Sequence, residues 1–457
     1  MSLSTLTAPA PAVGISDRLP GLLVGPGLVA LGGWIFMKVG PPPGTFAYIG
    51  SLALVAFGLL WSGLSLCLPA GRLWRFIRWL SINLLVLGAL LGMVEGIGRV
   101  AKINFAAIGP GAGKDSRQAY PIWAREPDRP LPEVFFLHPG PVRWTGRPLH
   151  ELERLRQGTD NAYASEPVVT IDYDTNGFRN PPDLKDWDAV VVGDSYVELG
   201  YLPFEQTSSA IAAARTGLRI KGLGACATGL LTYSRYLRHF GAAPSCKRVV
   251  YVMFEGNDVQ DTTREHQALE QYQRTGERPY KEAGVETSFV KAVAARFQCF
   301  GKAPRPQSYQ NAWFKSGNAE IPVTVSTELP VDPRAMTPAQ AAAMKAGITA
   351  LAAEARALHL EVSLVYVPFN NRVYHDLLRF DDKLPAEVRQ WRPDGLPAWV
   401  ADLCREQGIV FHNALPPLRA AAEKGRYVHN RIFDCHLNAE GAAILGDVIT
   451  DALKPGR

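Results

Sequence analysis

The sequence predicts an α/β domain with a mostly parallel sheet, preceded by a membrane segment of about three helices. From residue 168 onwards, short apolar runs alternate with helix-compatible stretches. Such alternation is typical of a parallel sheet covered by helices on both faces. The first hundred residues instead concentrate long apolar runs that lack the polar face of a soluble helix.

Three apolar runs, Leu22–Val39, Phe46–Leu68 and Trp79–Val94, have about the length that crosses a bilayer core. The first carries one charge, Lys38, near its end, and the other two carry none. We therefore expect residues 1–102 to be a multi-pass membrane region with the lipid bilayer as its partner.

The charges between the runs predict an orientation. The link Pro69–Arg78 holds three arginines and no acidic residue, which favours the cytoplasmic side. The link Gly40–Thr45 and the domain after the third run would then lie outside, in the periplasm or beyond. Arg99 and Lys102 beside the third run favour the reverse orientation, but long domains translocate largely regardless of such charges.

After the membrane region, residues 103–166 are rich in Gly, Pro and Arg and are expected to form a linker with local structure. Residues 167–457 are expected to form the α/β domain, with an insertion at about 262–345 that either covers a binding site or decorates the surface. The patterns of apolar residues predict strands at 168–174, 188–192, 218–223, 248–254, 361–367 and 409–411, and helices at 338–358, 397–407 and 439–453.

The tripeptide Gly193-Asp194-Ser195 follows the apolar strand 188–192 and precedes a helix-compatible stretch. A strand, a tight turn and a helix place the serine hydroxyl at the C-terminal rim of a parallel sheet, beside the free N–H groups of a helix N-terminus. Ser195 is therefore the candidate nucleophile for acyl transfer, and Asp194 is expected to brace the turn.

Two later segments supply the other groups that acyl transfer needs. Asn257 follows the strand 248–254 in a glycine turn and is the candidate oxyanion donor, with Asp258 as a bracing residue. His436 is the candidate general base, and Asp434 would hold its tautomer. Cys435 lies between them, but a cysteine nucleophile would leave Ser195 and Asn257 without roles.

These motifs resemble the SGNH branch of the GDSL hydrolases. The resemblance covers about residues 168–453: the serine tripeptide matches the family's first block, Gly256-Asn257-Asp258 its third, and Asp434 with His436 its fifth. It implies a flavodoxin-like three-layer α/β/α fold, a serine nucleophile and an Asp–His pair. The Asp–His spacing is two here, where the family commonly has three, and Gly256 directly precedes Asn257 instead of lying two residues before it.

The resemblance also implies an oxyanion hole built by the Ser195 amide, the Asn257 side chain and a backbone N–H from a second block. In the best register Ala227 occupies the family's glycine position, and the choice among Gly224, Ala227 and Gly229 stays open.

We therefore expect a serine-dependent esterase or deacylase that acts on an ester-linked acyl group of an envelope lipid or glycan. The alternatives are an O-acyltransferase acting on a cell-envelope polysaccharide and a catalytically degenerate, membrane-anchored assembly protein. No metal or organic cofactor is implied, and a net charge of +5, spread along the chain, gives no sign of nucleic-acid binding.

Overall fold

The computed structural model describes residues 14–39, 46–69, 71–101, 103, 105, 134, 136–138, 140–155, 158–276, 288–289, 308–432 and 434–454. The chain divides into two compact units, one comprising residues 1–112 and 284–300, the other residues 113–283 and 301–457. The expected link Gly40–Thr45 and most of residues 103–133 lie outside the described residues, as does much of the expected insertion.

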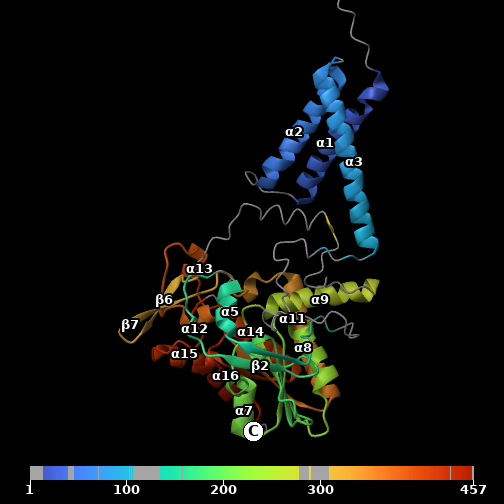
Figure 1. Cartoon of the computed structure of the whole chain (residues 1–457). Helices are drawn as coiled ribbons and strands as arrows, with labels where there is room; N and C mark the ends of the chain where they lie inside the picture. The colour runs from blue at the N-terminus through green and yellow to red at the C-terminus, as the bar shows by residue number, and fades with distance from the viewer. Residues whose placement is uncertain are drawn as a thin grey trace, which may run out of the picture. The chain divides into compact units, whose positions relative to one another are not determined.

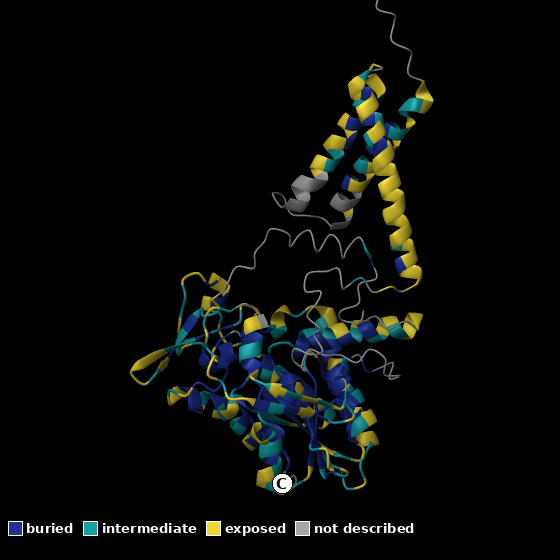
Figure 2. Ribbon diagram, in the orientation of Figure 1, coloured by how far each residue is buried: buried dark blue, intermediate teal, exposed yellow. Residues whose placement is uncertain are grey.

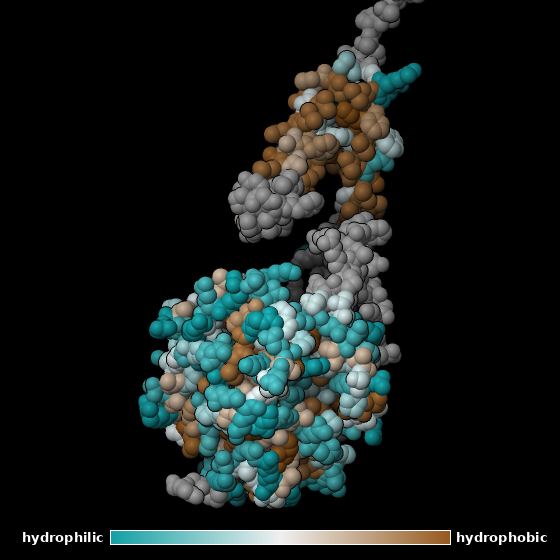
Figure 3. Space-filling model, turned by 90° about the vertical axis from the view of Figure 1, so that its left-hand side faces the viewer, coloured by the Kyte–Doolittle hydropathy of each residue, from teal (hydrophilic) through white to brown (hydrophobic). Residues whose placement is uncertain are grey.

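The described part of residues 1–112 forms the helices α1 (Ile15–Val39), α2 (Phe46–Cys67) and α3 (Arg72–Val100) (Figure 1). Among the described residues, α3 alone is both long and apolar enough to cross a membrane, and Leu52–Cys67 forms a shorter apolar helix. Hydrophobic residues dominate the visible surface of this unit (Figure 3). The helices cover the three apolar runs of the sequence, and the crossing of all three stays a prediction.

The second unit is built around five parallel strands: β3 (Ala189–Gly193), β4 (Ile220–Gly224), β5 (Arg248–Phe254), β8 (Glu361–Val367) and β10 (Val410–Asn413). Their spatial order is β4-β3-β5-β8-β10, or 2-1-3-4-5 in chain order. This is the flavodoxin-like order, whose topological switch point lies between β3 and β5. The predicted fold class is confirmed.

Helices cover both faces of this sheet because consecutive strand residues point to opposite sides. Val190, Val192 and Tyr251 pack against α8 (Leu230–Tyr236), α11 (Pro338–Ala357) and α14 (Leu396–Gln407). Val191 and Val250 belong to the core that includes α7 (Ser208–Thr216), α15 (Leu415–Glu423) and α16 (Ala439–Ala452). The strands are buried throughout their centre, as Figure 2 shows in dark blue.

Two smaller sheets flank the parallel one. The strands β1 (Val142–Gly146) and β2 (Val169–Tyr173) pair antiparallel, and β6 (Ala312–Ser316) pairs with β7 (Ala319–Val323) and β9 (Leu378–Phe380). Further helices in the described residues are α5 (Pro148–Leu155), α6 (Ser195–Glu198), α9 (Asp258–Thr275), α12 (Asn370–Tyr374) and α13 (Ala386–Gln390). Two of these elements, β1 and α5, lie in the segment expected to be a linker. The described parts of the expected insertion contain most of α9, the strands β6 and β7, and the start of α11.

Candidate active site

Ser195 is the first residue of the short helix α6, directly after β3. The Asp194 carboxylate caps this helix by accepting the Tyr196 N–H at 2.9 Å. A Cβ at Gly193 would lie 2.6 Å from Val197 Cγ2 and 2.9 Å from the Val252 carbonyl oxygen. Only glycine therefore allows this tight passage from strand to helix, which aims Ser195 at the C-terminal edge of the sheet.

His436 and Asp434 reach Ser195 from a segment 241 residues away. His436 Nε2 lies 2.7 Å from Ser195 Oγ, and His436 Nδ1 is bonded to Asp434 Oδ1. Asn430 Nδ2 donates to the second Asp434 oxygen at 2.8 Å. The two-residue spacing of Asp434 and His436 thus gives a continuous chain from carboxylate to imidazole to hydroxyl.

The charges around His436 favour a basic imidazole. Burial lowers the pKa of His436, but the facing Asp434 carboxylate more than offsets it, so that the pKa is raised above its ordinary value. Burial opposes ionisation of Asp434, yet the His436 partner and its hydrogen bonds bring its pKa down to about 2. Asp434 therefore stays ionised and holds the Nδ1 proton, which leaves Nε2 to accept the serine proton.

Asn257 lies on the neighbouring strand end, between β5 and α9. Its side-chain amide donates one hydrogen bond to the Asp261 carboxylate, one turn further along α9. Because a carboxamide has two N–H donors, the second is left for a ligand in the cavity. Asp258 braces the same turn by accepting the Phe254 N–H at 3.0 Å and the Tyr233 hydroxyl at 2.9 Å.

The loop after β4 distinguishes the three second-block candidates. Ala227 lines the same cavity as Ser195, whereas Gly224 and Gly229 do not. The Gly229 N–H already donates to the buried Glu265 carboxylate at 2.7 Å. Ala227 has φ of +58°, a left-handed conformation that favours glycine, which is consistent with the glycine that the sequence resemblance places here.

One cavity of 270 Å³ joins these groups. It opens at the switch point of the sheet, where ligands of doubly wound folds bind. Its lining residues are Leu149, Leu152, Ser195, Tyr201, Cys226, Ala227, Phe254, Gly256, Asn257, Ser326, Glu328, Phe369, Asp434, Cys435 and His436.

A buried carboxylate ties the serine helix to the Ala227 loop. Glu198, at the end of α6, is fully buried. Its oxygens accept the Tyr173 hydroxyl at 2.5 Å and the Cys226 N–H at 2.8 Å, and His138 Nε2 lies 3.1 Å away. This role of Glu198 is not predictable from the sequence, because a glutamate at a helix end gives no sign of burial.

A buried ion pair holds the Asn257 turn. Arg372 of α12 binds Glu255 and also Asp394, at 2.7 Å. Glu255 also accepts the Phe369 N–H at 2.8 Å. Phe369 reaches the cavity, whereas the neighbouring α12 residues do not line it. In the sequence, the role of Glu255 is indicated by its position immediately before the Gly256-Asn257 turn.

Among the described residues, two groups of side chains place possible metal-ligand atoms within 4.8 Å of one another: His138 with Glu198 and Cys226, and Asp434 with Cys435 and His436. In both groups the carboxylate already accepts hydrogen bonds from within the protein. Among the described residues no two cysteines form a disulfide with each other, and Cys299 lies outside the described residues.

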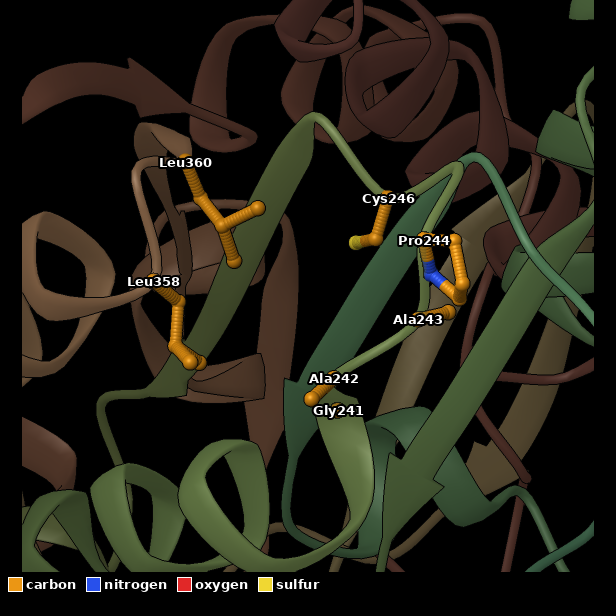
Figure 4. Close-up of a pocket in the computed structure, with 7 residues that line it drawn as sticks. All are labelled: Gly241, Ala242, Ala243, Pro244, Cys246, Leu358 and Leu360. Atoms are coloured by element: carbon orange, nitrogen blue, oxygen red, sulfur yellow. The ribbon is translucent and has the colours of Figure 1, made fainter.

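A separate hollow of 330 Å³ lies at the opposite end of the strands (Figure 4). It is lined by Gly241–Pro244, Cys246, Leu358 and Leu360, next to the start of β5 and β8. Burial raises the pKa of the Cys246 thiol, so it is a poor nucleophile. The candidate catalytic residues Ser195, Asn257 and His436 line the other cavity instead.

Comparison with known proteins gives distant structural likenesses. No family model and no curated protein matches the sequence. A protein assigned to the lipolytic G-D-S-L family from Desulfitobacterium hafniense DCB-2 is 13% identical, with 58% of this chain and 99% of that chain covered and a TM-score of 0.29. A member of the same family from Veillonella parvula DSM 2008 is 10% identical, with 58% and 97% covered and a TM-score of 0.29.

A carbohydrate esterase family 2 enzyme with a carbohydrate-binding domain, from Corynascus thermopiles, is 12% identical, with 63% of this chain and 70% of that chain covered and a TM-score of 0.29. Likenesses this remote decide nothing about chemistry. A function for this chain therefore has to come from the Ser195, His436 and Asp434 geometry.

Proposed function

We propose that the protein is a serine-dependent ester hydrolase. The observation that carries the proposal is the 2.7 Å contact between Ser195 Oγ and His436 Nε2, with the Asp434 carboxylate on the far side of the imidazole. This arrangement of nucleophile, base and orienting acid is the one that acyl transfer requires.

His436 Nε2 takes the proton of Ser195 Oγ as the oxygen attacks the ester carbonyl. The tetrahedral oxyanion accepts hydrogen bonds from the Ser195 and Ala227 N–H groups and from the Asn257 amide. His436 then returns the proton to the departing alcohol oxygen as the C–O bond breaks and an acyl-serine remains. Water attacks this ester with His436 again as base, which releases the carboxylic acid and restores Ser195.

The proposal is tested with Ser195→Ala in the full-length, detergent-solubilised protein. Labelling by a serine-directed fluorophosphonate and hydrolysis of p-nitrophenyl acetate should both be lost, because no other residue replaces the nucleophile. The matched control is Cys435→Ser, which alters a thiol in the same cavity. Labelling that survives Ser195→Ala but disappears in Cys435→Ser would transfer the nucleophile role to the cysteine.

The acceptor of the acyl group decides between an esterase and an O-acyltransferase. Ser326 and Glu328 give the cavity a polar portion that suits a hydroxylated alcohol such as a sugar or glycerol. We favour hydrolysis of an envelope lipid or glycan ester. The same assay with an added oligosaccharide detects transfer, and a protein that neither labels nor turns over ester substrates would instead fit an assembly role.

We further propose that α1, α2 and α3 all cross the membrane. Small residues let α1 and α2 approach closely, since a Cβ at Gly25 would lie 2.0 Å from Ser62 Oγ and one at Gly58 would lie 2.6 Å from the Gly25 carbonyl oxygen. Trp61 Nε1 donates to Ser81 Oγ at 3.1 Å and links α2 to α3. Close packing at small residues and hydrogen bonds between helices are typical of membrane bundles.

The charges of the helix ends support a cytoplasmic N-terminus. Arg18 donates to the carbonyl oxygens of Ser65 and Leu68 at the end of α2, at 2.7 and 3.2 Å. Arg78 pairs with Asp17 at 3.0 Å. Arg18 therefore joins Arg72, Arg75 and Arg78 at one end of the bundle, which the positive-inside rule assigns to the cytoplasm. With three crossings, the catalytic unit would be extracytoplasmic.

A further inference from the structure

Two leucines from the segment before the first strand of the parallel sheet line the catalytic cavity. Leu149 and Leu152 lie on α5, three residues apart and hence on one face of the helix. They are 7% and 8% exposed. Leu149 packs with Leu199, Tyr201 and Leu202, close to the serine helix. A segment that the sequence presents as linker thus forms part of the site.

The position of α5 is held by polar contacts that lead to the catalytic loop, the segment that carries Asp434 and His436. Glu153, 3% exposed, accepts the Tyr163 N–H at 3.4 Å. The Tyr163 hydroxyl in turn accepts the Ile432 N–H at 3.2 Å, two residues before Asp434. Leu152 packs against Ile432. These contacts make α5 a fixed wall of the cavity, attached to the segment that carries the base.

The cavity is small and largely apolar. Besides the two leucines, Phe254 and Phe369 supply hydrocarbon surface. Its volume of 270 Å³ lies below the roughly 300–1,000 Å³ of pockets that enclose drug-sized ligands. This size suits a short acyl group. The apolar lining also disfavours a charged acyl group, which would lose its hydration there.

We propose that Leu149 and Leu152 close the acyl-binding end of the cavity and limit the substrates to esters of short, uncharged acyl groups. This inference rests on the proposed ester hydrolysis. It assigns two specificity-determining residues to α5 and makes the preceding segment a functional part of the catalytic unit.

The test is a chain-length series with the full-length protein in detergent, from p-nitrophenyl acetate through butanoate, hexanoate and octanoate to dodecanoate. The wild type should prefer the short esters. Leu149→Ala and Leu152→Ala should each raise the octanoate-to-acetate ratio of kcat/KM by at least about tenfold, because each methylene accommodated in an apolar pocket is worth about 10- to 200-fold. Leu152→Trp should lower the hexanoate-to-acetate ratio by a similar factor.

The matched control is Leu202→Ala. Leu202 belongs to the same hydrophobic cluster as Leu149 but does not line the cavity. The chain-length profile of this variant should equal that of the wild type. An unchanged profile in all three cavity variants, or the same shift in Leu202→Ala, would overturn the inference while leaving ester hydrolysis intact. A wild type that neither labels with fluorophosphonate nor hydrolyses any ester would instead overturn the proposed function, and this inference with it.

Discussion

At the scale of single residues, the site depends on polar groups that are buried and hydrogen-bonded to other groups of the protein. Asp434 is 8% exposed and is compensated by His436 and Asn430. His429 is fully buried nearby, where burial lowers its pKa to about 3. His429 therefore stays neutral at working pH, and His436 is the imidazole that titrates in the site.

The proposed ester hydrolysis should depend on pH in a definite way, because the Asp434 carboxylate faces the His436 imidazole. The base must be neutral, so kcat/KM should fall as the pH drops through the His436 pKa, which lies above its ordinary value of 6.5. Asp434→Asn removes the charge that stabilises the imidazolium, so the acid limb should move to lower pH. The maximal rate should also drop about 10⁴-fold, because the imidazole would be held in the wrong tautomer.

The control for that profile is Asp194→Asn, because burial also raises the pKa of Asp194 beside Ser195. If the fall of kcat/KM at low pH disappears in Asp194→Asn, the titrating group is Asp194. A limb that stays at the same pH in Asp434→Asn would contradict the assignment to His436.

Ala227 allows a test of backbone strain at the oxyanion loop. An L-residue at φ of +58° costs about 1–2 kcal/mol, which glycine avoids. Ala227→Gly should keep full fluorophosphonate labelling, because the donor is a backbone N–H, and should leave the thermal midpoint unchanged or higher. Ala225→Gly, at a neighbouring position without positive φ, should lower the midpoint by an amount that corresponds to about 1 kcal/mol. Equal losses in both variants would argue against strain at Ala227.

At the scale of elements, the switch point between β3 and β5 explains why Ser195 and Asn257 meet. Neighbouring parallel strands end at the same edge, so the residues that follow β3 and β5 face each other across the crevice. The buried pair of Arg372 with Glu255 secures the end of β5 against α12. The loop after β4 is secured to α6 through Glu198.

The helices of the first unit permit a matched packing test. Gly25→Leu would push a side chain into Ser62 of α2, an overpacking that typically costs 1–3 kcal/mol. The yield of monodisperse protein in detergent and its thermal midpoint should both fall. Gly27→Leu on the same helix meets no atom within 4 Å of its Cβ and should behave as the wild type. A similar loss in both variants would mean that α1 and α2 do not pack at Gly25.

At the scale of the whole molecule, the two units differ in the surface they present. Large apolar side chains of α3, such as Leu87, Leu90 and Met93, are more than half exposed, which suits lipid. The visible surface of the catalytic unit is mostly hydrophilic (Figure 3). This contrast is expected for a catalytic unit in water that is joined to helices in a bilayer.

The proposed orientation predicts the behaviour of C-terminal fusions. Moving an arginine into the hydrocarbon costs about 2.5–3.5 kcal/mol on insertion scales, so the end with Arg18, Arg72, Arg75 and Arg78 should stay cytoplasmic. An alkaline phosphatase fusion at the C-terminus should be active, and a green fluorescent protein fusion exported by the same route should be dark. The opposite pattern would place the catalytic unit in the cytoplasm.

Much of the fold was readable from local sequence. The five parallel strands, α11, α14 and α16 were expected close to their observed bounds, because buried strands are short β-branched runs. Thr337 and Asn438 also mark the starts of α11 and α16 as N-cap residues. The short strands β1, β6, β7 and β9 were not expected. Their pairing depends on partners far along the chain, which local periodicity does not report.

The sequence by itself determined which residue types were available for acyl transfer, because Ser195, Asn257 and the Asp434–His436 pair stand beside predicted strand ends or helices. Tertiary structure alone decided that Ala227, rather than Gly224 or Gly229, reaches the cavity, and that Leu149, Leu152 and Glu198 belong to the site. The physical reason is that burial and cavity walls arise from contacts between segments distant in the chain, here α5, the β4 loop and the catalytic loop, while a sequence pattern describes one segment at a time.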